Sequence, residues 1–154
     1  MTHWKKLTNP KYLGAYAFDP GEEKVATIAS VAEESIPKDN GEPETKLVAY
    51  FEEPDIKPLI LNKTNMKAIE KAYETPYIEQ WEGLAVILCV QKVSSFGGDI
   101  VDAVRIRPMM PPTCESCGKP IRPAEGKTCQ EFARYTQTKY KKKLCSECAE
   151  KVKK

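Results

Sequence analysis

The sequence predicts a mainly β protein: a five-stranded Greek-key barrel with one helix between strands three and four, followed by a small C-terminal zinc-binding module. Three observations support this prediction. One helical segment stands inside a series of strand-like segments, a β-branched apolar run follows it, and four of the six cysteines form two Cys-x-x-Cys pairs. The order strand, strand, strand, helix, strand, strand is that of the OB-fold barrel, a common binder of single-stranded nucleic acid.

The first three strands follow from alternating or short apolar patterns. Residues 24–31 (KVATIASV) and 46–52 (KLVAYFE) alternate apolar and polar side chains, as half-buried strands do. The acidic segment between them, residues 32–45, contains two prolines and an Asn-Gly pair, so we expect a mobile connection. Residues 59–61 form a short apolar third strand.

A helix and a buried strand follow. Thr64 can cap the helix, apolar residues from Met66 to Tyr73 recur at helical spacing, and Pro76 ends it. Residues 84–93 are an apolar, β-branched run typical of a strand buried on both faces. This run is the predicted fourth strand.

The fifth strand is predicted at residues 100–107. Its alternation directs Val104 and Ile106 inward, while Arg105 and Arg107 share the opposite face. Two arginines are therefore expected on one surface of the sheet.

The proline-rich segment 108–112 (PMMPP) is predicted to be a stiff linker, because proline disfavours both helix and ladder. It separates a barrel, residues 1–111, from a zinc module with a basic helix, residues 112–154. The barrel carries 13 Lys+Arg against 17 Asp+Glu, net −4, and the module carries 11 against 5, net +6, which together give +2. A slightly acidic body with a basic tail is the expectation.

The two Cys-x-x-Cys pairs predict a structural zinc site. Four thiolates can form a tetrahedral shell around Zn²⁺, and a segment with so few large apolar residues needs a metal ion to fold. Cys89 and Cys129 are expected to be structural thiols, although the sequence leaves open whether Cys129 contributes to the metal site. The predicted ligands are Cys114, Cys117, Cys145 and Cys148.

Residues typical of enzymes are missing, so we expect no catalytic activity. His3 is the single histidine, which excludes Ser/His and Cys/His pairs and the HExxH zinc motif. The acidic pairs Glu22-Glu23, Glu33-Glu34 and Glu52-Glu53 are expected in solvated turns.

The expected compartment is the cytoplasm. The longest apolar run is far shorter than the roughly 20 residues that span a bilayer, and the N-terminus lacks the apolar core of a signal peptide. In a reducing compartment, six cysteines favour metal ligation over disulfides, and no membrane partner is expected.

Aromatic and basic residues on the exposed faces of the strands and loops are candidate contacts for single-stranded DNA. Stacking requires an open ring, and contact with the phosphates requires cations beside it. The alternative for each is an ordinary solvated strand face or, for the aromatics, packing on the barrel. The barrel candidates are Lys46, Tyr50, Lys57, Lys92, Phe96, Arg105 and Arg107, and the module adds Lys141, Lys142 and Lys143.

The chain resembles the small OB-fold single-stranded DNA-binding proteins of tailed phages and prophages. The resemblance lies in three segments, YFEEPDIKPLILNKTNMKAIEKAY, WEGLAVILCVQKV and IVDAVRIRP. The tail, CESCGKPIRP…ARYTQTKYKKKLCSECA, is similar to two-knuckle zinc tails of phage replication and recombination proteins, including strand-annealing proteins. Many bacterial and phage single-strand binders end in an acidic tip that recruits partners, whereas this chain ends AEKVKK.

The resemblance implies a non-enzymatic protein that binds single-stranded DNA during phage-type replication or recombination. Partners would be replication or recombination proteins, in the bacterial host cytoplasm if the protein is phage-encoded, and the protein would be a monomer or homodimer. Two alternatives stay open. One is an OB-fold protein-interaction adaptor whose zinc tail docks another replication or regulatory protein, and the other is a small structural or regulatory adaptor without nucleic acid.

Overall fold

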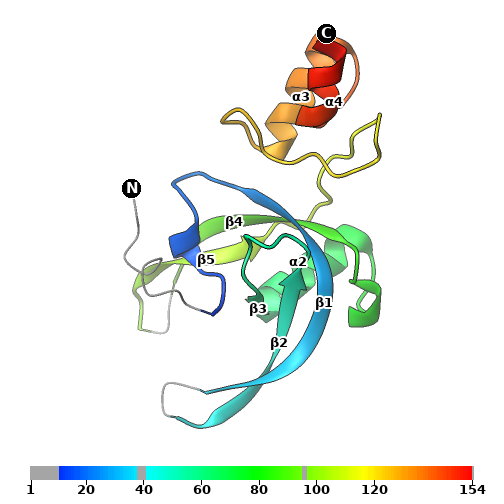
Figure 1. The fold of residues 1–154 in the computed structure, drawn as a ribbon. Coiled ribbons are helices and arrows are strands. Elements are labelled where there is room, and N and C mark those ends of the chain that lie inside the picture. The colour runs from blue at the N-terminus through cyan, green and yellow to red at the C-terminus, as the bar shows by residue number, and fades with distance from the viewer. Residues whose placement is uncertain (1–10, 38–40, 95–96, 154) are drawn as a thin grey trace.

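The strands and helices occur in the predicted order (Figure 1). The computed structural model describes residues 11–37, 41–94 and 97–153. The strands are β1 (Lys24–Pro37), β2 (Pro43–Phe51), β3 (Leu59–Leu61), β4 (Ala85–Ser94) and β5 (Ile100–Ile106). The α-helices are α2 (Lys63–Tyr73), α3 (Cys129–Tyr140) and α4 (Ser146–Lys153), and two short 3₁₀ helices are η1 (Ala15–Ala17) and η2 (Ile78–Gln80).

The five strands form one antiparallel sheet, in the order β3-β2-β1-β4-β5, that curls into an OB-like half-barrel. Strand β1 belongs to both halves of the sheet. Its residues 24–27 pair with β4, its later residues pair with β2, and the register shifts between Ile28 and Ser30. A shift of this kind bends a strand, which accounts for the strong curvature of β1 in Figure 1. The predicted fold class, mainly β with one helix between the third and fourth strands, is confirmed.

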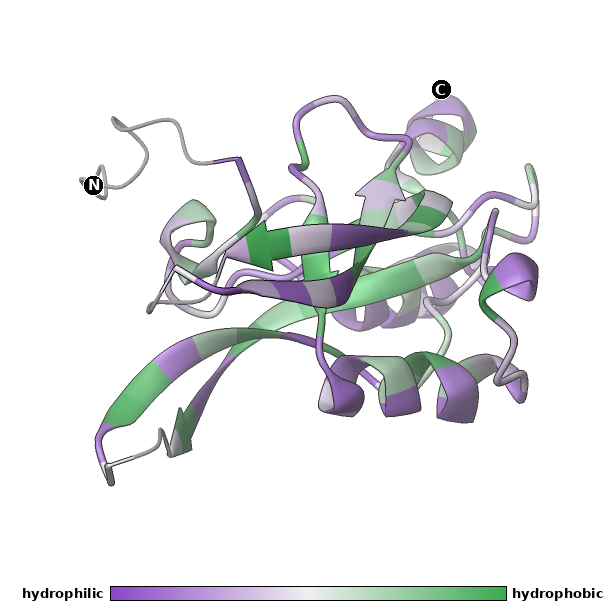
Figure 2. Ribbon diagram, turned by 90° about the horizontal axis from the view of Figure 1, so that it is seen from below, coloured by the Kyte–Doolittle hydropathy of each residue, from purple (hydrophilic) through white to green (hydrophobic). Residues whose placement is uncertain are grey.

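The predicted mobile connection at residues 32–45 is wrong. Both strands continue into this segment, and their ladder extends to the pair Pro37 and Pro43. Ladder hydrogen bonds use the backbone, so an acidic sequence can still form a two-stranded ribbon, and the two prolines lie at its end. The resulting β1–β2 hairpin projects away from the rest of the molecule (Figures 1 and 2).

The inner face of the half-barrel holds the larger hydrophobic core. Ile28 of β1, Leu88 of β4 and Ile69 of α2 are fully buried there. Val104 and Ile106 of β5 also point into this core, as predicted. The helices carry alternating hydrophobic and hydrophilic bands in Figure 2, as helices buried on one side do.

Helix α2 covers the free edge of β5 through one buried side chain, Asn65. Its Nδ2 donates to the carbonyl oxygen of Val104 (3.2 Å), and its Oδ1 accepts from the amide of Ile106 (3.0 Å). These backbone groups face away from β4, so the Asn65 carboxamide takes the place of a neighbouring strand. The helix is capped by Asn62, whose Oδ1 accepts from the Asn65 amide, and not by Thr64 as predicted.

The C-terminal segment packs on the outer face of the sheet. Along β4, Val86 and Leu88 belong to the barrel core, whereas Ala85 and Ile87 belong to a second hydrophobic cluster. That cluster joins them to Val25 of β1 and to Ile121, Cys129, Phe132 and Leu144 of the C-terminal segment. The prediction that this strand is buried on both faces is confirmed for residues 85–89.

A polar contact beside this cluster links the same two parts. Arg122 donates through Nη1 to the carbonyl oxygen of Val25 (2.5 Å) and pairs through Nη2 with Glu53 (2.7 Å). The Glu53 carboxylate also accepts from the amide of Thr27. Burial raises the pKa of Glu53, but the Thr27 amide and the Arg122 guanidinium together bring that pKa below its ordinary value.

Replacing Asn65 with Ala should destabilise the protein by about 2–4 kcal/mol, because it leaves the Val104 carbonyl and the Ile106 amide buried without partners. Urea unfolding measures the effect. Thr64→Ala, an exposed change one residue away in the same helical turn, is the matched control. Equal destabilisation by the two substitutions would show that the Asn65 carboxamide does not hold the edge of β5.

Acid should weaken the docking of the C-terminal segment. Because the folded pKa of Glu53 is lowered, its stabilising contribution is present above its unfolded pKa and is lost as the pH falls through the folded value. Between about pH 6 and about pH 3.5, Glu53→Gln should therefore lose less unfolding free energy than the wild type does. Glu52→Gln, at the exposed neighbouring carboxylate, should behave like the wild type. Identical pH profiles for Glu53→Gln and the wild type would contradict the assignment.

Candidate functional site

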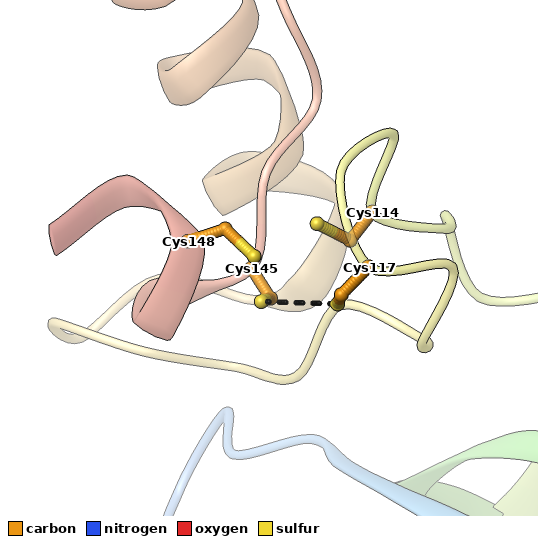
Figure 3. Close-up of side chains that lie close together, drawn as sticks. All are labelled: Cys114, Cys117, Cys145 and Cys148. Atoms are coloured by element: carbon orange, nitrogen blue, oxygen red, sulfur yellow. Dashed lines mark hydrogen bonds between the residues drawn. The ribbon is translucent and has the colours of Figure 1, made fainter. Parts of the chain in front are cut away.

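Four cysteine side chains converge in the C-terminal module. Their Sγ atoms all lie within 4.8 Å of one another, and Figure 3 shows two coming from a loop and two from the start of α4 and the residue before it. The Sγ atoms of Cys117 and Cys145, one from each pair, are 3.7 Å apart. The cluster therefore has the composition and spacing to hold a metal ion. Its members are Cys114, Cys117, Cys145 and Cys148.

The first pair lies in a tight backbone turn. The Cys114 amide donates to the Lys119 carbonyl oxygen (2.9 Å), and the Gly118 amide donates to the Cys114 carbonyl oxygen (3.0 Å). Gly118 has φ +76°, in the left-handed region that glycine adopts without strain. The turn directs the amides of Ser116 and Cys117 at the Cys114 sulfur.

The second pair is positioned by α3. Thr136 is fully buried, and its Oγ1 accepts from the Leu144 amide (3.0 Å) while donating to the Ala133 carbonyl oxygen (3.1 Å). The hydrogen bond from the Leu144 amide fixes the position of Leu144, the residue just before Cys145. Glu115 then joins the two pairs, because its amide donates to the Lys143 carbonyl oxygen (2.8 Å) and its carboxylate accepts from the Lys143 amide (2.6 Å).

Burial and hydrogen bonds shift the pKa values of Cys114 and Cys145 in opposite directions. Burial raises the pKa of Cys114, but backbone amides of Cys117, Cys145 and Ser116 lower that pKa to about 6. Burial and the neighbouring thiols raise the pKa of Cys145 to about 12. A divalent cation bound by the four sulfurs would lower the pKa of each coordinating thiol, because its charge stabilises every thiolate that binds it.

The other two cysteines lie apart from this cluster. Cys129 is the first residue of α3 and is fully buried in the second hydrophobic cluster, where burial raises the pKa of its thiol to about 11. Cys89 lies on β4 opposite Arg105, and burial raises its pKa too. Among the described residues, neither belongs to the group of four sulfurs.

Most of the predicted cations on the strands are paired with carboxylates. Lys46 pairs with Glu44 (3.6 Å), and Lys92 pairs with Asp102 (3.1 Å). Arg107 pairs with Glu23, whose side chain is only 9% exposed. These partners reduce the positive charge that the barrel offers to a phosphate backbone.

The remaining barrel candidates lie on different strands and loops. Tyr50 donates its hydroxyl to Glu34, and this hydrogen bond raises the pKa of Tyr50. Lys57 is half-buried before β3, and Arg105 is half-buried on β5. The sheet order places β1 and β4 between Tyr50 and Arg105. Phe96 lies outside the described residues.

The three module candidates are exposed and close to the cysteine cluster. Lys141 ends α3 in the left-handed conformation (φ 63°), and Lys142 and Lys143 lead to Cys145. Within the described ranges, none of the three forms an ion pair. The nearby carboxylate of Glu115 accepts from the backbone amide of Lys143.

A polar face of α3 also lies beside Lys143, and it was not among the predicted contacts. Gln130, Arg134 and Gln137 are exposed and recur at intervals of three or four residues. The signal that could have identified them is this helical spacing, opposite the buried Phe132 and Thr136.

No protein-family model, curated protein or solved structure matches the chain. In the part of the chain that the structure describes, no helix has the length and apolar character needed to cross a bilayer. The function is therefore inferred from the geometry and charge of the site.

Metal binding should depend on the four clustered cysteines alone. Cys145→Ser should lower the metal content of the purified protein and unfold the module, because three sulfurs and a hydroxyl hold the ion less tightly. Cys129→Ala should keep the metal ion, since Cys129 lies in the hydrophobic cluster. Elemental analysis measures both. Loss of the metal ion in Cys129→Ala with retention in Cys145→Ser would contradict the assignment.

Proposed function

We propose that this protein is a non-enzymatic binder of single-stranded DNA, and that its C-terminal module, folded around a structural Zn²⁺, supplies the main contacts to the strand. The observation that supports this most strongly is the exposed run Lys141–Lys143, free of ion pairs among the described residues and fixed beside the cysteine cluster. The setting is phage-type replication or recombination, as the resemblance implies.

Zinc is the metal that suits the sulfur geometry. A tetrahedral shell with Zn–S bonds of about 2.3 Å places neighbouring sulfurs about 3.8 Å apart. The observed 3.7 Å between the Cys117 and Cys145 sulfurs is close to this value. Four cysteine ligands leave no position for a reactive water, so the ion stabilises the module and catalyses nothing.

The metal ion and the lysines act together on a phosphate backbone. The module carries net +6, and four thiolates with one Zn²⁺ add about −2, so about +4 remains. The lysines neutralise phosphates and release counterions, which makes affinity fall as salt rises. By contrast, the barrel contributes mainly the surface on which the module folds.

A protein-interaction adaptor is the second candidate function. Met109 and Met110, in the linker before the module, are 40% and 58% exposed. Exposed methionines are common at surfaces that bind other proteins.

Neutralising the exposed run should reduce single-strand affinity and its salt dependence. We expect Lys141→Gln/Lys142→Gln/Lys143→Gln to bind a single-stranded oligonucleotide about tenfold or more weakly, with the salt slope smaller by about 2 if three phosphate contacts are lost. The matched control is Lys63→Gln/Lys67→Gln/Lys71→Gln, which removes the same charge from exposed positions on α2. Titrations with single-stranded and duplex oligonucleotides at two salt concentrations measure both effects.

Two results would contradict the proposal. An equal or larger loss in the α2 variant would place the nucleic-acid contacts on the barrel. A wild-type protein that binds neither oligonucleotide would favour the adaptor.

A further inference from the structure

A groove of about 490 Å³ lies between α3 and the linker that precedes the first cysteine pair. Met110 and Pro112 form the linker side. The α3 side consists of residues on one face of the helix, namely Gln130, Ala133, Arg134 and Gln137. Its volume lies in the range of sites that hold a small organic group, about 300–1,000 Å³.

The lining is positive, with apolar contacts and amides between the charges. Arg134 and Lys143 are its charged residues, and no carboxylate lines it among the described residues. Met110 and Pro112 provide the apolar surface, because Ala133 is almost fully buried. The Gln137 carboxamide has no hydrogen-bond partner in the described part of the chain, so it can donate and accept toward a ligand.

We propose that this groove receives one unpaired base of the DNA strand, with the flanking phosphates on Arg134 and Lys143. This inference rests on the proposed function. A base has an apolar face that can lie on Met110 and Pro112, and edge atoms that suit the Gln137 carboxamide. The lysine run attracts any polyanion, whereas a groove that takes a single base selects an unpaired strand over a duplex.

The experiment compares three polyanions of similar charge against the metal-loaded full chain: single-stranded oligothymidylate, an abasic deoxyribose-phosphate strand of the same length, and oligoglutamate. Binding of a base should make the affinity for oligothymidylate about tenfold or more higher than the affinity for the other two. If the abasic strand or oligoglutamate binds as tightly as oligothymidylate, the groove assignment is overturned. The protein would then bind polyanions through charge alone. No binding of any strand overturns the proposed function as well.

A pair of variants locates the base. Gln137→Glu places a carboxylate in the groove, and Thr138→Glu places the same charge one residue away on the exposed surface of α3. The preference for oligothymidylate over the abasic strand should fall in Gln137→Glu and persist in Thr138→Glu. Gln137→Ala, which adds no charge, should also reduce the preference for oligothymidylate. The zinc content of each variant shows whether its module is folded. An unchanged preference in both Gln137 variants overturns the proposal.

Discussion

The outer face of β4 carries apolar side chains that must be buried against another part of the chain. The rest of the structure depends on this contact. Val25 and Ile87 turn away from the barrel core and pack with Ile121 and Phe132 of the C-terminal module. Burying a side chain of this size contributes about 1.5–3 kcal/mol, whereas a partly exposed ion pair such as Arg122–Glu53 contributes about 1 kcal/mol or less. The apolar contact therefore provides most of the docking energy, and the ion pair helps fix the orientation of the module.

This arrangement makes the cysteine cluster and the barrel dependent on each other. The module has few large apolar residues of its own, so its core is completed on one side by β4 and on the other by the four-cysteine cluster, which can hold a metal ion. The side chains of Thr136 and Glu115 connect α3 and the two cysteine pairs, because they accept from the backbone amides of Leu144 and Lys143. Among the described residues, Glu115 forms no ion pair with the neighbouring lysines.

Local patterns in the sequence predicted the elements, but not the contacts between distant ones. Periodicity identified the strands and α2, and the spacing of the cysteine pairs identified the cysteine cluster. The continuous apolar run of β4 also indicated burial on both faces, although nothing local showed that residues near Phe132 provide the cover. The pairing of Arg107 with Glu23 was not predicted because it depends on the fold and not on a local pattern.

The claim that the barrel and the module form one folded body can be tested most directly by ¹⁵N relaxation of the metal-loaded full chain. A shared core predicts the same rotational correlation time for amides of β1, β4 and β5 and for amides of α3 and α4. A markedly shorter correlation time for α3 and α4, with the metal ion still bound, would contradict it. The module would then be tethered by its linker, and the outer face of β4 would need another cover.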